Sequence, residues 1–98
     1  MDYNVRYTRR ARGDLGSIYS YISAHSSQGS QAVKHAIQKR IILLGSFPFA
    51  APLTNHQDVH ELSIVRYPYK VYYRVEDRNV WVLRIRHAKR AAWNAEDD

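Results

Sequence analysis

Basic residues and one histidine are concentrated near the end of the sequence, between Arg66 and Arg90. This segment, RYPYKVYYRVEDRNVWVLRIRHAKR, contains eight Arg and Lys residues together with His87. Guanidinium and ammonium groups neutralise phosphates and carboxylates, and an imidazole can gain or lose a proton near neutral pH. The segment could therefore bind an anionic partner, or it could stabilise and protonate a phosphate during a reaction.

The charge of the whole chain supports an anionic partner. Its formal net charge is +6, although three of the nine acidic residues stand together at the end as Glu96, Asp97 and Asp98. A field of this sign favours encounters with nucleic acid, with an enzyme bound to nucleic acid, or with an acidic protein. The alternative is that the charge only keeps a small protein soluble.

Length and composition exclude several classes. A chain of 98 residues predicts one domain, residues 1–98, with a modest core. Without cysteine it can form neither a disulfide nor a thiolate zinc site. No apolar run approaches the ~20 residues of a membrane span, and the start MDYNVRYTRR lacks a secretory signal, so we expect a cytoplasmic protein with no membrane partner. His56 and His60 fall in a loop and a strand, so no metal pair is expected there. No cofactor is expected either.

The first half of the sequence has the pattern of a strand and two helices. Tyr3, Val5 and Tyr7 alternate with polar residues, which predicts a strand with one buried face. Thr8 is placed to cap a helix with apolar residues at three- and four-residue spacing: Ala11, Leu15, Ile18 and Ile22. SSQGS, residues 26–30, has the composition of a turn, and a second periodic run ends at Gly45. The pattern predicts an antiparallel helical hairpin.

The second half has the pattern of three strands. Residues 45–58 predict a loop, and alternating residues at 60–65, 69–75 and 81–87 predict the strands, with the turn EDRN joining the last two. By this alternation Trp81, Leu83, Ile85 and His87 share a face, and Trp81 is predicted to lie in the core with Tyr69 and Tyr73. The end of the chain, residues 88–98, could form a short helix or a tail.

These elements predict an α+β domain of order βααβββ. In it the helical hairpin packs on one face of a small antiparallel sheet, and the last three strands form a meander.

Four sequence segments accompany this order of elements: ARGDLGSIYSYI in the first helix, FPFAAPL in the loop, and the strand sequences ELSIVRYPYKVYYRV and VWVLRIRHAKR. Together with the order of elements, they resemble the ParE/RelE superfamily of bacterial toxins from type II toxin-antitoxin modules. The resemblance covers nearly the whole chain. It implies a toxin that arrests growth until an antitoxin wraps around it, and it implies one of two targets. ParE-like members act on DNA gyrase, whereas RelE-like members cut messenger RNA on the ribosome.

The nuclease alternative requires a specific set of groups. RNA cleavage without a metal needs a base, an acid and cations around the phosphate. Lys70 stands where RelE-like toxins place a phosphate-stabilising residue, Arg84 could assist, and His87 could act as the acid. However, the loop has Phe49–Ala51 where related ribonucleases carry a glutamate base, and Ala88 follows His87 where several carry a tyrosine. These departures favour a toxin that binds its target without cleaving it.

We therefore expect a ParE-like toxin that inhibits DNA gyrase by binding. The alternatives are a ribosome-dependent mRNA endonuclease built around Lys70, Arg84 and His87, and a basic interaction domain that has lost toxicity. The residues expected to bind the target are Arg66, Lys70, Arg74, Arg84, Arg86 and Arg90.

Two tyrosines and the histidine have further interpretations. Tyr19 and Tyr21 flank the apolar stripe of the first helix and are expected to contact the antitoxin. His87 can instead be a hydrogen-bonded residue that closes the edge of the core. The basic residues of the strands can likewise form an ordinary solvated face.

Overall fold

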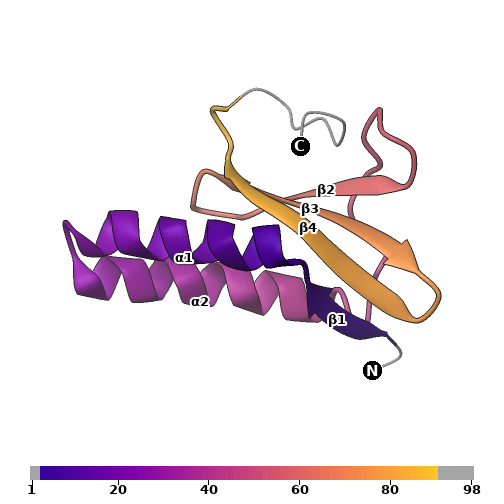
Figure 1. Cartoon of the computed structure of the whole chain (residues 1–98), viewed down its shortest axis with the longest axis horizontal. Coiled ribbons are helices and arrows are strands. Elements are labelled where there is room, and N and C mark those ends of the chain that lie inside the picture. Colours follow the sequence, from indigo (N-terminus) through magenta and orange to yellow (C-terminus); the bar gives the residue numbers. More distant parts are fainter. Residues whose placement is uncertain (1–2, 91–98) are drawn as a thin grey trace.

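The computed structural model describes residues 3–90, in which two helices lie side by side against a four-stranded sheet (Figure 1). The predicted α+β class and the order of the elements are confirmed. The helix or tail predicted for residues 88–98 lies mostly outside the described residues. In chain order the elements are β1 (Asn4–Tyr7), α1 (Arg9–Ser23), α2 (Ser27–Leu43), β2 (Val59–Ser63), β3 (Tyr69–Glu76) and β4 (Asn79–His87).

The strands are ordered β1-β4-β3-β2 across the sheet. The predicted meander is confirmed, because β2 pairs with β3 and β3 with β4 in antiparallel register, and a turn at Asp77 and Arg78 joins the last two strands. By contrast, β1 pairs with β4 in parallel, with Val5 opposite Val80. Strands far apart in the sequence are not constrained by a hairpin turn, so alternation in β1 alone does not predict its direction.

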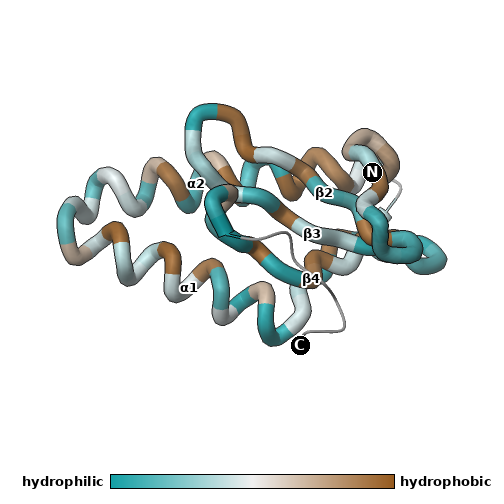
Figure 2. The backbone as a smooth tube through the Cα atoms, turned by 90° about the horizontal axis from the view of Figure 1, so that it is seen from above, coloured by the Kyte–Doolittle hydropathy of each residue, from teal (hydrophilic) through white to brown (hydrophobic). Residues whose placement is uncertain are grey.

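The core lies between the sheet and the helical hairpin. Val71, Tyr73, Val80 and Val82 of the sheet are fully buried, and Ile37 belongs to the same cluster from α2. Figure 2 shows hydrophobic and hydrophilic positions alternating along both helices, as expected for helices with one apolar face. Burial of each large apolar side chain contributes about 1.5–3 kcal/mol, so this cluster holds the hairpin on the sheet.

Side-chain caps begin both helices. Thr8 is the predicted cap of α1, and its hydroxyl oxygen accepts a hydrogen bond from the Ala11 N–H at 3.1 Å. The turn predicted for residues 26–30 is wrong, because Ser26 caps α2 by accepting from the Gly29 N–H at 2.9 Å, and the helix begins at the next residue. Serine favours helix N-caps as well as turns, so composition alone does not separate the two.

The inward side of β4 also differs from the prediction. Val80 and Val82 are fully buried, whereas Trp81 is only half-buried and is absent from the main core cluster. The register between β3 and β4 shifts between Tyr72 and Tyr73, so Leu83 has no paired residue on β3. Beyond this bulge, the side chain that faces the core is that of Ile85. The predicted inward placement of Trp81 and Leu83 is therefore wrong, because a bulge shifts the side-chain alternation by one residue.

Candidate functional site

A cleft between α1 and the end of β4 gathers several of the predicted residues. Its volume is about 350 Å³, and four of its lining residues were proposed from the sequence: Tyr21, Arg86, His87 and Arg90. Asp14, Ser17 and Ile18 of α1, Tyr69 of β3 and Ile85 of β4 complete the lining.

An ion pair fixes the distance between the two walls of this cleft. Asp14 of α1 accepts two hydrogen bonds from Arg84, one from Nε to Oδ2 at 2.7 Å and one from Nη2 to Oδ1 at 3.1 Å. Asp14 Oδ2 also accepts the N–H of Ile85 at 2.9 Å, in the part of β4 beyond its pairing with β1. The two charged side chains are only 15% and 17% exposed. Arg84 therefore anchors α1 to β4.

The bulge in β4 is secured by the start of the same helix. The Thr8 hydroxyl donates to the carbonyl oxygen of Leu83 at 3.0 Å, and the Thr8 N–H donates to the carbonyl oxygen of Val82 at 3.0 Å. Thr8 thus caps α1 and satisfies the backbone of β4. The strand residues that follow the bulge, including Arg86 and His87, are placed relative to α1 by these bonds together with the Asp14 contacts.

Arg86 supplies a cation with unused hydrogen-bonding capacity. Its Nε is buried and has no hydrogen-bond partner in the described part of the chain. A buried donor of this kind costs free energy unless a partner accepts from it. Because Arg90 lines the same cleft, the local field favours an anionic acceptor such as a carboxylate or a phosphate.

His87 has defined hydrogen bonding. Its Nδ1 accepts the N–H of Lys89 at 3.0 Å, and its ring lies edge-on to Tyr69 with 5.4 Å between ring centroids. In the neutral imidazole the proton is therefore on Nε2. Burial, and then the nearby Tyr21, raise the pKa of the Tyr69 phenol, so this cleft residue stays neutral and can donate a hydrogen bond.

Lys70 lies apart from the cleft. It pairs with Arg86 across the sheet, whereas His87 pairs with Tyr69, so the pleat starts Lys70 and Arg86 on the face opposite His87. Arg86 nevertheless lines the cleft, at the edge of β4 beside α1, and Lys70 does not. Lys70 Nζ lies 3.0 Å from Glu61 Oε2. The hydrogen bond to this carboxylate raises the pKa of Lys70 and keeps it cationic.

The six basic residues expected to bind the target occupy different places. Arg86 and Arg90 line the cleft, whereas Arg84 is engaged with Asp14. Arg74 pairs with Trp81 and is half-buried, and Arg66 is an exposed residue between β2 and β3 with φ of 81°. These residues therefore do not form the single basic face that was expected from β3 and β4. Arg86 and Arg90 line the cleft, and the others lie outside its lining.

The two tyrosines predicted to contact an antitoxin lie on different sides of α1. Tyr21 lines the cleft and is 71% exposed. Tyr19 lines a groove between α1 and α2, where Lys34 Nζ lies 5.0 Å from its ring centroid. One partner can touch both tyrosines only if it passes around α1.

Asp14 is the important residue that sequence reasoning did not assign to the site. Its signal was present, because it is the only carboxylate between Asp2 and Asp58. An isolated acid in a strongly basic helical region indicates a specific cationic partner, but the partner is seventy residues away in the sequence. Arg84 could therefore be identified as this partner only from the folded structure.

Within residues 3–90, no group of three or more His, Cys, Asp or Glu side chains is arranged to hold a metal ion. In the same part of the chain, neither helix has the length and apolar character needed to cross a bilayer.

Comparisons with solved structures define the class of protein as the ParE/RelE fold. The chain is similar to one from the chromosomal ParDE toxin-antitoxin system of P. aeruginosa, with 22% identity, a TM-score of 0.80, and coverage of 90% of this chain and 98% of that one. It is also similar to a chain of the intact E. coli RelBE complex (20% identity, TM-score 0.68, coverage 90% and 99%). The RelBE2 complex of Mycobacterium tuberculosis matches with 22% identity, a TM-score of 0.66, and coverage of 89% and 99%.

The family follows from the sequence match. Residues 5–92 match the family described as "ParE toxin of type II toxin-antitoxin system, parDE", and the chain belongs to this family. No curated protein matches the sequence significantly.

Proposed function

We propose that this toxin inhibits DNA gyrase by binding and breaks no bond in its target. The observation that carries the proposal is that the groups needed for RNA cleavage do not converge. Lys70 is paired with Glu61 on the face opposite His87, and Arg84 is held by Asp14. Cleavage would require an acid, a base and cations within hydrogen-bond reach of one phosphate.

The same cleft is suited to recognition. Arg86 and Arg90 line it with two cations, and the buried Nε of Arg86 lacks a hydrogen-bond partner among the described residues. Tyr21 and Tyr69 supply aromatic surface beside these charges. Arginine flanked by tyrosine is typical of strong contacts at protein interfaces, and an acidic surface of the target would satisfy both arginines.

The remaining basic residues would widen this surface. Arg66, Lys70 and Arg74 lie outside the cleft and would add electrostatic attraction, which raises the rate of association more than the affinity. Arg84 would contribute indirectly, by holding α1 against β4 through Asp14.

The partner that silences the toxin would be a cognate antitoxin in the cytoplasm. Solved structures with this fold include toxin-antitoxin complexes of E. coli and Mycobacterium tuberculosis. Tyr21 is the most exposed of the large hydrophobic residues in the described part of the chain, which makes it a suitable anchor for such a partner. An antitoxin segment rich in acidic residues would complement the net charge of +6.

One observation supports the nuclease alternative. Arg86, His87 and Arg90 share the cleft, and His87 Nε2 would carry the proton of the neutral ring. On this alternative, the toxin would cut messenger RNA on the ribosome with His87 as the acid.

The test is to induce the toxin in bacteria without an antitoxin and to pulse-label DNA synthesis and protein synthesis in parallel. We expect DNA synthesis to fall first. Arg86→Gln should relieve growth arrest, whereas Lys39→Gln, an equal charge change at an exposed position on α2, should not. If protein synthesis falls first and His87→Gln abolishes the arrest without lowering the melting temperature, the nuclease alternative is correct.

A further inference from the structure

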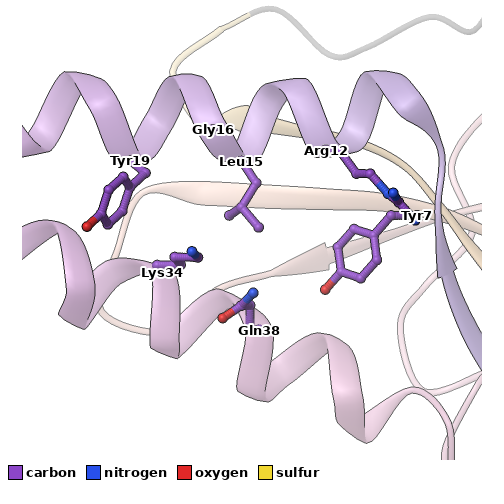
Figure 3. Close-up of a pocket in the computed structure, with 7 residues that line it drawn as sticks. All are labelled: Tyr7, Arg12, Leu15, Gly16, Tyr19, Lys34 and Gln38. Carbon is purple, nitrogen blue, oxygen red and sulfur yellow. The ribbon is translucent and has the colours of Figure 1, made fainter.

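The groove between α1 and α2 is a second recessed surface of the toxin (Figure 3). Its main hollow has a volume of about 400 Å³ and is lined by both helices and by Tyr7 of β1. A second hollow of about 340 Å³ continues it, with Tyr19, Lys34 and Gln38 common to both. In Figure 3 the strands pass behind the helices, so the groove opens on the side of the hairpin turned away from the sheet.

The helical hairpin is strongly basic. From residue 9 to residue 43 the sequence contains six Arg and Lys residues, and its one carboxylate, Asp14, is held by Arg84. The first turn of α1 contains no acidic residue and begins with Arg9 and Arg10. Cations at a helix N-terminus are disfavoured by the helix dipole. The helix dipole therefore does not favour this arrangement.

The side chains in the groove indicate what it binds. Cations project from both walls as Arg12 and Lys34, Gln38 offers an amide, and Tyr7 and Tyr19 present aromatic rings. Leu15 adds an aliphatic side chain to this lining, and none of the most exposed large hydrophobic residues of the described chain lies there. Cations that contact phosphates, combined with rings that stack on bases, are typical of surfaces that bind single-stranded nucleic acid.

Gly16 leaves the floor of the groove open. No atom outside its own helix segment lies within 4 Å of the position that a Cβ would occupy. Figure 3 places it between Arg12 and Tyr19 along α1. A nucleobase could approach the helix backbone there without displacing a side chain.

We propose that the groove between α1 and α2 binds single-stranded nucleic acid, independently of the cleft at the end of β4. Phosphates would contact Arg12 and Lys34. Bases would stack on Tyr7, and on Tyr19 once Lys34, whose Nζ lies 5.0 Å from that ring centroid, turns to a phosphate. The affinity would fall as salt rises, because these contacts release counterions.

The test measures binding of the purified full-length chain to fluorescein-labelled oligothymidylate and oligouridylate of about 12 nucleotides, by fluorescence anisotropy. We expect saturable binding, with a slope of log K against log salt that decreases in size by about 1.4 when Arg12→Gln and Lys34→Gln are combined. Gly16→Met should weaken binding at least about tenfold by filling the groove. Because methionine favours helix more than glycine does, this variant should remain folded.

Gly13→Met is the matched control. Gly13 is also exposed on α1 with no atom near its Cβ position, and it does not line the groove, so its replacement should leave binding unchanged. Equal binding by the Gly16 and Gly13 variants, or no binding at about 50 mM salt, would overturn the proposal. The proposal would also be overturned if no oligonucleotide bound, while a glutamate-rich helical peptide bound the wild type and failed to bind the Gly16→Met variant.

Discussion

Replacement of Asp14 by alanine should destabilise the toxin far more than a surface substitution. The change removes a carboxylate that bonds Arg84 twice and accepts the N–H of Ile85. It removes the carboxylate that faces the Arg84 guanidinium, whose side chain is only 15% exposed. Loss of one partner of a buried ion pair costs about 3–5 kcal/mol, and partial exposure of this pair reduces the expected loss to about 3 kcal/mol. For a domain of this size, that loss lowers the melting temperature by roughly 12 °C or more.

Urea unfolding followed by circular dichroism measures this loss, with the Lys70–Glu61 pair as the comparison. Because that pair is more exposed, Glu61→Ala should cost no more than about 1 kcal/mol. Asp14→Asn should fall between the two, since the amide oxygen can still accept from Ile85. The double replacement of Asp14 and Arg84 should cost less than the sum of the single replacements. A loss below about 1 kcal/mol for Asp14→Ala would refute the anchoring role.

Three further outcomes are expected. Ser26→Ala should cost about 1 kcal/mol in urea unfolding, because it removes the cap of α2. Burial raises the pKa of Tyr73 above its ordinary value of 10.0, so the unfolded phenol loses its proton first and stability should fall above about pH 10. The fall should be smaller in Tyr73→Phe when melting temperatures are compared across this pH range. Tyr21→Ala should weaken antitoxin binding at least about tenfold in calorimetry without changing the melting temperature, because the side chain is largely exposed.

The order of the elements could be predicted because it depends on local signals. Thr8 lies three residues before an apolar stripe of helical period, and the alternation in β3 matches its buried side at Val71 and Tyr73. The bulge at Leu83 could not be predicted in this way, because both sides of β4 carry apolar residues near Trp81. Alternation then has no polar side from which to read the register.

The sequence could predict which residues belong to the candidate site, but it could not predict how they are arranged in space. Basic residues from Arg66 to Arg90 are evident in the sequence, but their separation depends on tertiary contacts. Arg84 forms an ion pair with Asp14, which is seventy residues away in the sequence. Arg86, two positions after Arg84, lines the cleft, and its Nε has no hydrogen-bond partner among the described residues. Neither outcome follows from strand alternation.

The most direct test of the central claim is a supercoiling assay in which purified DNA gyrase is titrated with the purified toxin. We expect supercoiling to fall as toxin is added, Arg86→Gln to weaken the inhibition at least about tenfold, and Lys39→Gln to leave it unchanged. Supercoiling that continues at saturating toxin, with cleavage of messenger RNA on purified ribosomes by the same preparation, would contradict this claim.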